Sequence, residues 1–290
     1  MTPVSYRAQF PLSNPWPHSS WSTTGCVTKL NAKALSFEMP STTPVYLIYG
    51  IPNSGRREIL HDLIEGGLSR DQSVLYFRPA KEAASEFDAK IESLENTQVV
   101  AWELTEGKVK HGPISAAPEK VFFLSPGEAD PADVAEALKS WIEHNDCELG
   151  RIITVVHCSF LSENSGSRAW FDACIHFSDV VLLGKREATN NKWVQSFHQS
   201  YRKTCAPCLI EPVIKGKARN PFTVIEPQAR RLSLYFDKLL PIEEDAFDDE
   251  EKPEDTRPDR YIERNEGGQR CYPIPDIRNF LQDYFPKTES

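Results

Sequence analysis

The sequence has no long apolar run and no sign of an export signal. A helix that crosses a bilayer needs about 20 consecutive, mainly apolar residues, and the apolar runs of this chain are much shorter. The N-terminal stretch MTPVSYRAQFPLSNPWP has neither the basic start nor the apolar core of a signal peptide. We therefore expect a cytoplasmic protein without membrane contact.

The cysteines do not form a disulfide framework. The chain has seven of them, an odd number scattered along a mid-sized sequence, which is typical of reduced thiols. Cys205 and Cys208 form a C-x-x-C pair, but no second pair supplies the two further ligands that zinc needs. A redox pair would begin a helix, whereas these cysteines follow one. We interpret them as structural thiols, with metal binding or redox chemistry as weaker alternatives, and His157 and Cys158 as the nearest extra ligands.

A basic stripe is also missing. The net charge is −9, and residues 243–255 (EEDAFDDEEKPED) hold nine acids and one lysine, so the rest of the chain lies near neutrality. This excludes a general nucleic-acid-binding surface, which needs clustered Lys and Arg. Because like charges at this density repel one another, we predict a disordered acidic linker over residues 243–260.

The sequence does contain a regular alternation of short apolar runs and helical patterns. The runs cover residues 45–49, 73–77, 98–102, 120–124, 151–156, 179–183 and 208–214. Between them apolar residues recur at helical spacing, as in PADVAEALKSWIEHN, where Pro131 can begin a helix. Continuous apolar strands are typical of a parallel sheet covered by helices on both faces. We predict a doubly wound, mostly parallel α/β domain over residues 44–225.

The segments that flank this domain differ in composition. Residues 1–43 are rich in Pro, Ser and Thr but carry aromatic residues, so we expect them to pack on or flank the domain. We predict a helical extension over 226–242 and a short amphipathic helix within 261–290. The apolar face of that helix consists of Ile277, Phe280, Leu281, Tyr284 and Phe285. This face either docks on its own domain or binds a protein partner.

The first apolar run leads through a glycine turn into a helical pattern, VYLIYGIPNSGRRE (45–58). The spacing of its two glycines is that of a phosphate-binding loop, in which backbone N–H groups and a helix N-terminus face an anion. The lysine and the hydroxyl residue that normally follow are replaced by two arginines. We expect the following residues of this degenerate loop to face a nucleotide or anion: Gly50, Asn53, Ser54, Gly55, Arg56 and Arg57.

The arginine pair changes what the loop can do. A guanidinium is wide, planar and suited to bidentate contacts, unlike the compact ammonium of lysine. A second cation at the hydroxyl position also repels Mg²⁺. The sequence therefore predicts no Mg-dependent hydrolysis, although two arginines at a helix N-terminus can hold an anion without a metal. An ordinary strand-to-helix turn with exposed arginines is the competing interpretation.

Four later segments resemble the CobW-like metallochaperone GTPases, a family of P-loop proteins. They are ELTEGKVKHGP (103–113), FFLSPGEADPADVAEAL (122–138), GRIITVVHCSF (150–160) and FSDVVLLGKRE (177–187). The likeness spans about residues 45–215. It implies a P-loop fold and, in the family, a GTP site with Mg²⁺ and a cysteine cluster for metal.

Compared position by position, the resemblance implies that this chain keeps the fold of the family but lacks side chains that bind phosphate and metal there. Leu124 stands where the family has an acidic residue, and residues 107–111 (GKVKH) replace the cysteine cluster. The guanine-reading motif falls on residues 184–187, so the resemblance assigns base contact to Lys185 and Glu187.

Together, these observations favour a degenerate CobW-like P-loop protein that serves as a binding or scaffolding module without Mg-dependent GTP hydrolysis. This interpretation requires no cofactor, and GTP or another phosphate anion bound without Mg²⁺ is its one candidate. An active nucleotide hydrolase or metallochaperone with an atypical loop stays open, as does a Mg-independent anion or nucleotide sensor. We expect a protein partner to bind through the C-terminal helix or the acidic tail.

Overall fold

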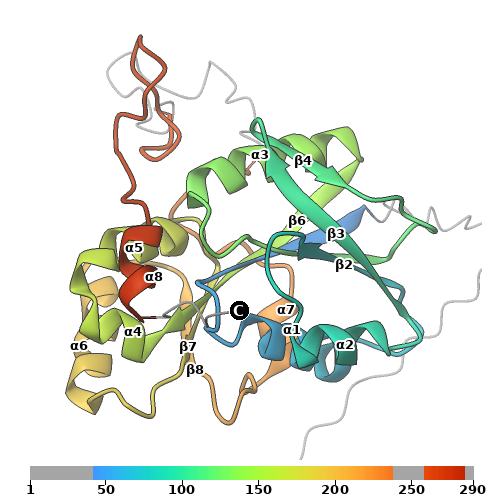
Figure 1. The fold of residues 1–290 in the computed structure, drawn as a ribbon, viewed down its shortest axis with the longest axis horizontal. Coiled ribbons are helices and arrows are strands. Elements are labelled where there is room, and N and C mark those ends of the chain that lie inside the picture. The colour runs from blue at the N-terminus through green and yellow to red at the C-terminus, as the bar shows by residue number, and fades with distance from the viewer. Residues whose placement is uncertain (1–41, 238–257, 285–290) are drawn as a thin grey trace, which may run out of the picture. The chain divides into compact units, whose positions relative to one another are not determined.

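The computed structural model describes residues 42–237 and 258–284. The expectations for residues 1–41, for most of the acidic linker and for residues 285–290 fall outside these ranges. An eight-stranded sheet runs through the described chain, with helices packed against it (Figure 1). Within these ranges no helix is long and apolar enough to cross a membrane.

The sheet is parallel with one exception. The strands are β1 (Thr43–Tyr49), β2 (Val74–Pro79), β3 (Thr97–Thr105), β4 (Lys108–His111), β5 (Lys120–Leu124), β6 (Cys147–His157), β7 (Val180–Gly184) and β8 (Leu209–Pro212). Their order is β4-β3-β2-β5-β1-β6-β7-β8. Only the pairing of β3 with β4 is antiparallel. The predicted doubly wound, mostly parallel α/β fold is confirmed.

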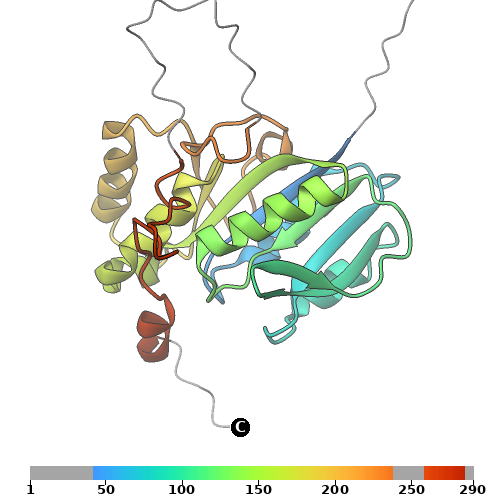
Figure 2. The same ribbon diagram turned by 90° about the horizontal axis from the view of Figure 1, so that it is seen from above.

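Each face of the sheet carries its own apolar core. The helices are α1 (Arg56–Gly67), α2 (Glu86–Glu92), α3 (Pro131–His144), α4 (Cys158–Glu163), α5 (Arg168–His176), α6 (Asn191–Lys203), α7 (Pro221–Ile225) and α8 (Arg278–Tyr284), with a 3-10 turn at Ser165–Ser167. Along β1, Val45 and Leu47 point to one core and Tyr46 and Ile48 to the other. Helices α1, α2 and α7 contribute to the second core, and α3, α4, α5, α6 and α8 to the first. Figure 2 shows α3 lying across one face of the sheet.

Local sequence signals explain where these helices begin. The Asp130 side chain accepts a hydrogen bond from the Ala132 N–H at 2.8 Å, and Pro131 occupies the first turn of α3. In α2, Ser85 and Asp88 form a capping box, in which each side chain bonds the other's backbone N–H. Helix α1 instead follows Gly55, whose φ of +92° lies in the left-handed region that favours glycine.

The strand order places a switch point at β1. The strands from β2 to β5 lie on one side of β1, and after β5 the chain crosses β1 to place β6, β7 and β8 on the other. In open α/β sheets, ligands bind in the crevice at the carboxyl ends of the strands beside such a point. The glycine turn after β1 lies at this end of the sheet.

The helical extension predicted for residues 226–242 is wrong over its described part. Residues 226–237 contain no helix. The segment is held instead by the buried carboxylate of Asp179, which accepts from the Arg230 N–H at 2.6 Å and pairs with the Arg231 guanidinium at 3.2 Å. These tertiary contacts override the helical periodicity of the sequence.

The C-terminal segment packs on its own domain. Tyr261, Ile277 and Leu281 are buried in the first core, and Asp259 pairs with His176 on α5 at 2.7 Å. Helix α8 lies within the segment where the sequence predicts an amphipathic helix. Two of the predicted apolar positions are therefore used inside the chain.

Candidate phosphate-loop site

The glycine turn joins β1 to α1 and is shaped by three left-handed or extended positions. Gly50 has φ +147°, Asn53 φ +60° and Gly55 φ +92°. A Cβ on Gly50 would lie 2.7 Å from the Val155 carbonyl oxygen, so the close approach of β1 and β6 requires glycine there. The expected strand–turn–helix geometry of a phosphate loop is thus present.

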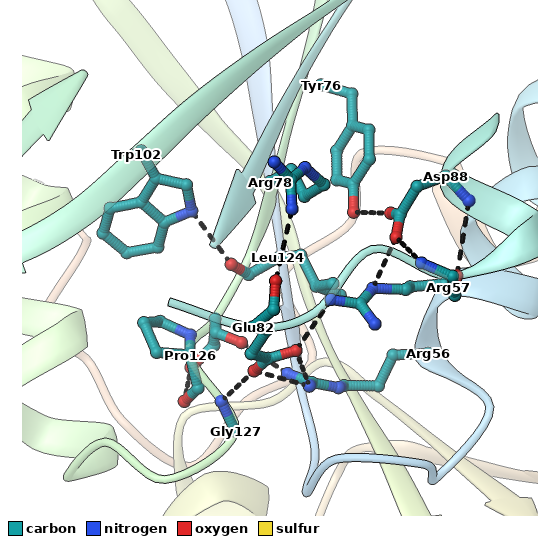
Figure 3. A network of polar contacts seen from close by, with 12 residues as sticks. Arg56, Arg57, Tyr76, Arg78, Glu82, Asp88, Trp102, Leu124, Pro126 and Gly127 are labelled. Carbon is teal, nitrogen blue, oxygen red and sulfur yellow. Dashed lines mark hydrogen bonds and ion pairs between the residues drawn. The ribbon is translucent and has the colours of Figure 1, made fainter. Parts of the chain in front are cut away.

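The Arg56 side chain turns inward from this loop and is 3 % exposed. Its Nη2 donates to both carboxylate oxygens of Glu82, at 2.9 and 2.8 Å, and its Nη1 donates to the Ser125 carbonyl oxygen. Figure 3 shows the guanidinium lying between the loop that follows β2 and the loop that follows β5. The cation at the lysine position therefore links three loops.

The neighbouring Arg57 binds the same carboxylate. Its Nη2 lies 3.0 Å from Glu82 Oε2, and its Nε lies 3.2 Å from Asp88 Oδ2. Asp88 is itself held by the Tyr76 hydroxyl at 2.9 Å and by the Ser85 N–H at 2.7 Å. Burial, followed by the nearby Asp88 carboxylate, raises the pKa of Tyr76 above its usual value. We call the four charged residues Arg56, Arg57, Glu82 and Asp88 the arginine–carboxylate network.

Glu82 is the centre of this network. Burial alone would raise its pKa, but Arg56, the Gly127 N–H and Arg57 outweigh burial, so the pKa of Glu82 is lowered. The Gly127 N–H donates to Glu82 Oε1 at 2.7 Å. A Cβ on Gly127 would lie 2.6 Å from Pro52 Cδ, so only glycine allows the loop after β5 to approach this closely.

An open cavity of about 240 Å³ lies on the outer side of the loop. Asn53, Gly55, Arg57 and Lys185 line it, together with Arg56, Glu58, Ser85 and Phe87. Lys185 adopts φ +48°, and its Cε would lie 3.8 Å from a Cβ on Gly55. The structure thus brings the predicted base-contacting lysine next to the predicted phosphate loop.

Glu187 and Ser54 line a second, much smaller cavity of about 30 Å³, with Lys185. A space of that size holds about one water molecule and no nucleobase. The Ser54 hydroxyl is buried, and in the described part of the chain no hydrogen-bond partner lies within reach of it. The predicted residues are therefore near one another but do not form a base pocket.

The end of β5 offers no ligand for a metal ion. Leu124 is fully buried, and its carbonyl oxygen accepts from Trp102 Nε1 at 3.0 Å. Throughout residues 42–237 and 258–284, no cluster of three or more His, Cys, Asp or Glu side chains is placed to hold a metal ion. The carboxylates of Glu82 and Asp88 are bonded to guanidinium groups, whereas Glu58 lines the cavity outside the loop.

The remaining candidates differ in burial and hydrogen bonding. Cys205 is exposed with φ +53°, whereas Cys208 is partly buried, and burial raises its pKa to about 11. His157 caps α4 by accepting from the Phe160 N–H at 3.2 Å. Burial and then Lys185 lower the pKa of His157 to about 4, and burial raises that of Cys158 to about 12. A thiol with a raised pKa is a poor nucleophile at neutral pH.

Sequence reasoning missed the acidic half of the network. Glu82 and Asp88 lie 25 or more residues beyond the arginines in the chain, and nothing in their local sequence marks them. The sequence signal for these acids was indirect. Two adjacent arginines at the start of a helix that packs against a sheet need negatively charged partners, because buried charges are paired.

Comparisons with known proteins give a limited result. No protein-family model and no curated protein matches the sequence. The solved structures that match include zinc-bound YjiA GTPase from E. coli and a zinc-bound triple mutant of YjiA GTPase, each at 12 % identity with a TM-score of 0.42. Each match covers 65 % of this chain and 66 % of the other, which is just under two thirds of those proteins. This identity establishes no correspondence between individual site residues.

Proposed function

We propose that this protein is a binding or scaffolding module built on a P-loop-type fold, and that it does not hydrolyse Mg-nucleotides. The observation that carries the proposal is the position of Arg56. Its guanidinium is buried and bonded to Glu82 and to the Ser125 carbonyl, so it binds protein groups that surround the loop. In a hydrolysing loop the equivalent cation reaches the terminal phosphates.

The charges beside the loop support the absence of a metal. Two guanidinium groups and two carboxylates balance one another in the arginine–carboxylate network. Mg²⁺ requires oxygen ligands in near-octahedral geometry, and it would have to draw Glu82 away from two arginines. Leu124 supplies no carboxylate in exchange. Each requirement of Mg-dependent phosphoryl transfer is thus opposed by a specific group.

A second function, Mg-independent binding of a phosphate anion, is favoured by the cavity beside Lys185. Arg57 and Lys185 supply positive charge there, and the N-terminus of α1 adds to it. The cavity volume of about 240 Å³ is below the roughly 300 Å³ at which small-molecule pockets begin. This size favours an inorganic phosphate or pyrophosphate over a whole nucleotide.

A protein partner remains part of the proposal. Ile277 and Leu281 of the predicted apolar face are buried in the domain, which supports the docking alternative for that helix. We therefore assign the partner interaction to the acidic segment rather than to α8. The partner would be a protein with a basic surface, because the segment holds nine acids and one lysine.

The experiment is calorimetry with GTP, GDP and ATP, each with and without Mg²⁺, combined with an assay of phosphate release. We expect no Mg-dependent binding and no turnover. Submicromolar Mg-dependent binding with turnover contradicts the proposal. For the anion function, pyrophosphate should raise the melting temperature, and Lys185→Ala should abolish that rise. Lys108→Ala, on the distant edge strand β4, is the matched control and should retain it.

A further inference from the structure

A groove at the other end of the sheet has an apolar floor and a cationic rim. It lies between α6 and the edge strand β8 and has a volume of about 380 Å³. Leu183, Val194 and Ile210 contribute to the floor, and Arg186, His198 and Arg202 to the rim. The volume falls within the roughly 300–1,000 Å³ of small-ligand and side-chain pockets.

The two arginines of this rim lack counter-charges. Residues 188–210, which include all of α6, contain no Asp or Glu. Within residues 42–237 and 258–284, no ion pair or side-chain hydrogen bond engages Arg186, His198 or Arg202. Several other arginines of the domain are paired, among them Arg168 with Asp172 and Arg270 with Glu136. The groove therefore presents unneutralised positive charge around an apolar surface.

One segment of the same chain matches this surface. Residues 243–255 (EEDAFDDEEKPED) carry nine acids around a single aromatic residue, Phe247. An aromatic side chain suits the apolar floor, and the acids on both sides of it suit the arginines of the rim. We propose that the groove binds the acidic segment 243–255 of its own chain, with Phe247 on the floor, whenever the basic partner of the proposed function is not bound.

The anchor points of the segment are tied to the starts of β7 and β8, the strands that contribute Leu183 and Ile210 to the groove. The Asp237 carboxylate is bonded to Arg231, which pairs with Asp179 at the start of β7. The Asp179 carbonyl accepts from the Leu209 N–H at 2.9 Å, one residue before Ile210 of the groove floor. On the other side of the segment, Asp259 is bonded to His176, which lies three residues before Asp179 in the chain. The residues that flank the segment are thus fixed close together.

The length of the intervening chain fits this geometry. Ten residue steps separate Asp237 from Phe247, and eleven separate Phe247 from Pro258. An extended chain covers about 3.3 Å per residue, so Phe247 can lie up to roughly 33 Å from either anchor. Leu183, the β7 residue that lines the groove, lies four residues beyond Asp179, a distance of about 13 Å at the rise of a parallel strand. The acidic segment can therefore reach the whole groove.

The test is carbodiimide cross-linking of the full chain, which joins carboxylates directly to nearby lysine amines. Lys192 and Lys203 of α6 are exposed beside the groove, whereas Lys108 and Lys110 lie on the opposite edge strand β4. We expect cross-links from residues 243–255 to Lys192 or Lys203 within monomers. The double variant Arg186→Glu/Arg202→Glu should reduce their yield at least about fivefold, since it replaces two attractive contacts by repulsive ones.

Two further variants keep the test specific. Arg70→Glu/Arg219→Glu reverses two exposed arginines outside the groove and should leave the yield unchanged. Phe247→Ser retains the acids and should lower the yield, because the floor is apolar. The proposal is overturned if Lys108 and Lys110 cross-link as strongly as the α6 lysines, or if the links form only between two chains. An unchanged yield in the groove variant, with its melting temperature retained, overturns it as well.

Discussion

The substitution Glu82→Gln tests the arginine–carboxylate network most directly. It removes the charge that Arg56 and Arg57 share while keeping the size of the side chain. Arg56 is 3 % exposed and Glu82 is 16 % exposed, so the pair is close to fully buried. Breaking a buried ion pair from one side costs roughly 3–5 kcal/mol, and the partial exposure of Glu82 places the expected loss of unfolding free energy at about 3 kcal/mol.

Equilibrium unfolding in urea measures this loss. With a urea dependence of about 3 kcal/mol per molar, the midpoint should fall by roughly 1 M. Glu103→Gln is the matched control: its ion pair with Lys81 is 3.8 Å long and exposed, so its removal should cost no more than about 0.5 kcal/mol. Equal midpoints for the two variants would show that Glu82 does not stabilise the loops, and the reasoning would be refuted.

The pH dependence of the same variant provides an internal check. The pKa of Glu82 is lower in the folded protein than its ordinary value of 4.5, mainly because Arg56 overcomes the effect of burial. A depressed carboxyl pKa contributes stability above the unfolded value, and this contribution is lost as the pH falls through the folded value. The difference between wild type and Glu82→Gln should therefore be full at about pH 7 and should shrink below about pH 4.5.

Three other predictions concern the site and its surroundings. The double variant Arg56→Lys/Arg57→Ser restores the usual loop residues and should be less stable than the wild type. It should still release no phosphate from Mg-GTP, because Leu124 supplies no carboxylate, and turnover above background would contradict this. Gly127→Ala should cost about 1–3 kcal/mol in thermal or urea unfolding, since its Cβ would lie 2.6 Å from Pro52, while Gly112→Ala, whose nearest neighbour is 3.6 Å away, should be neutral. The pKa of Asp259 is lowered because its bond with His176 outweighs burial, so protection against hydrogen exchange in residues 258–284, measured relative to the intrinsic rate at each pH, should fall below about pH 4. Asp259→Asn should already show this lower protection at neutral pH, and equal protection in the two proteins would argue against it.

The sequence was sufficient to predict the sheet because its strands are buried on both faces. The run at 120–124 coincides with β5, and the other predicted runs overlap β1, β2, β3, β6, β7 and β8. Strand β4 was missed, since Lys108 and Lys110 on an exposed edge leave no apolar pattern to detect. Burial on both sides gives a strong signal, and an edge strand with one partner gives almost none.

The candidate site was predictable only in part, for a related reason. The glycines after β1 are local requirements of a tight turn, and they identify the loop from sequence alone. The orientation of Arg56 depends on Glu82 and Gly127, which come from two other loops of the chain. Such contacts follow from the three-dimensional arrangement of strands, so the expectation of arginines that face an anion could not anticipate an internal carboxylate.

The burial of Ile277 and Leu281 also determines when the protein can fold during synthesis. Both side chains complete a core whose other members lie as early in the chain as Val45. A nascent chain whose residues 277–281 are still inside the ribosome lacks these side chains at its folding surface. The domain can therefore complete its core only after this segment has emerged, and a stop codon after residue 257 but before this helix would leave apolar core residues exposed to aggregation.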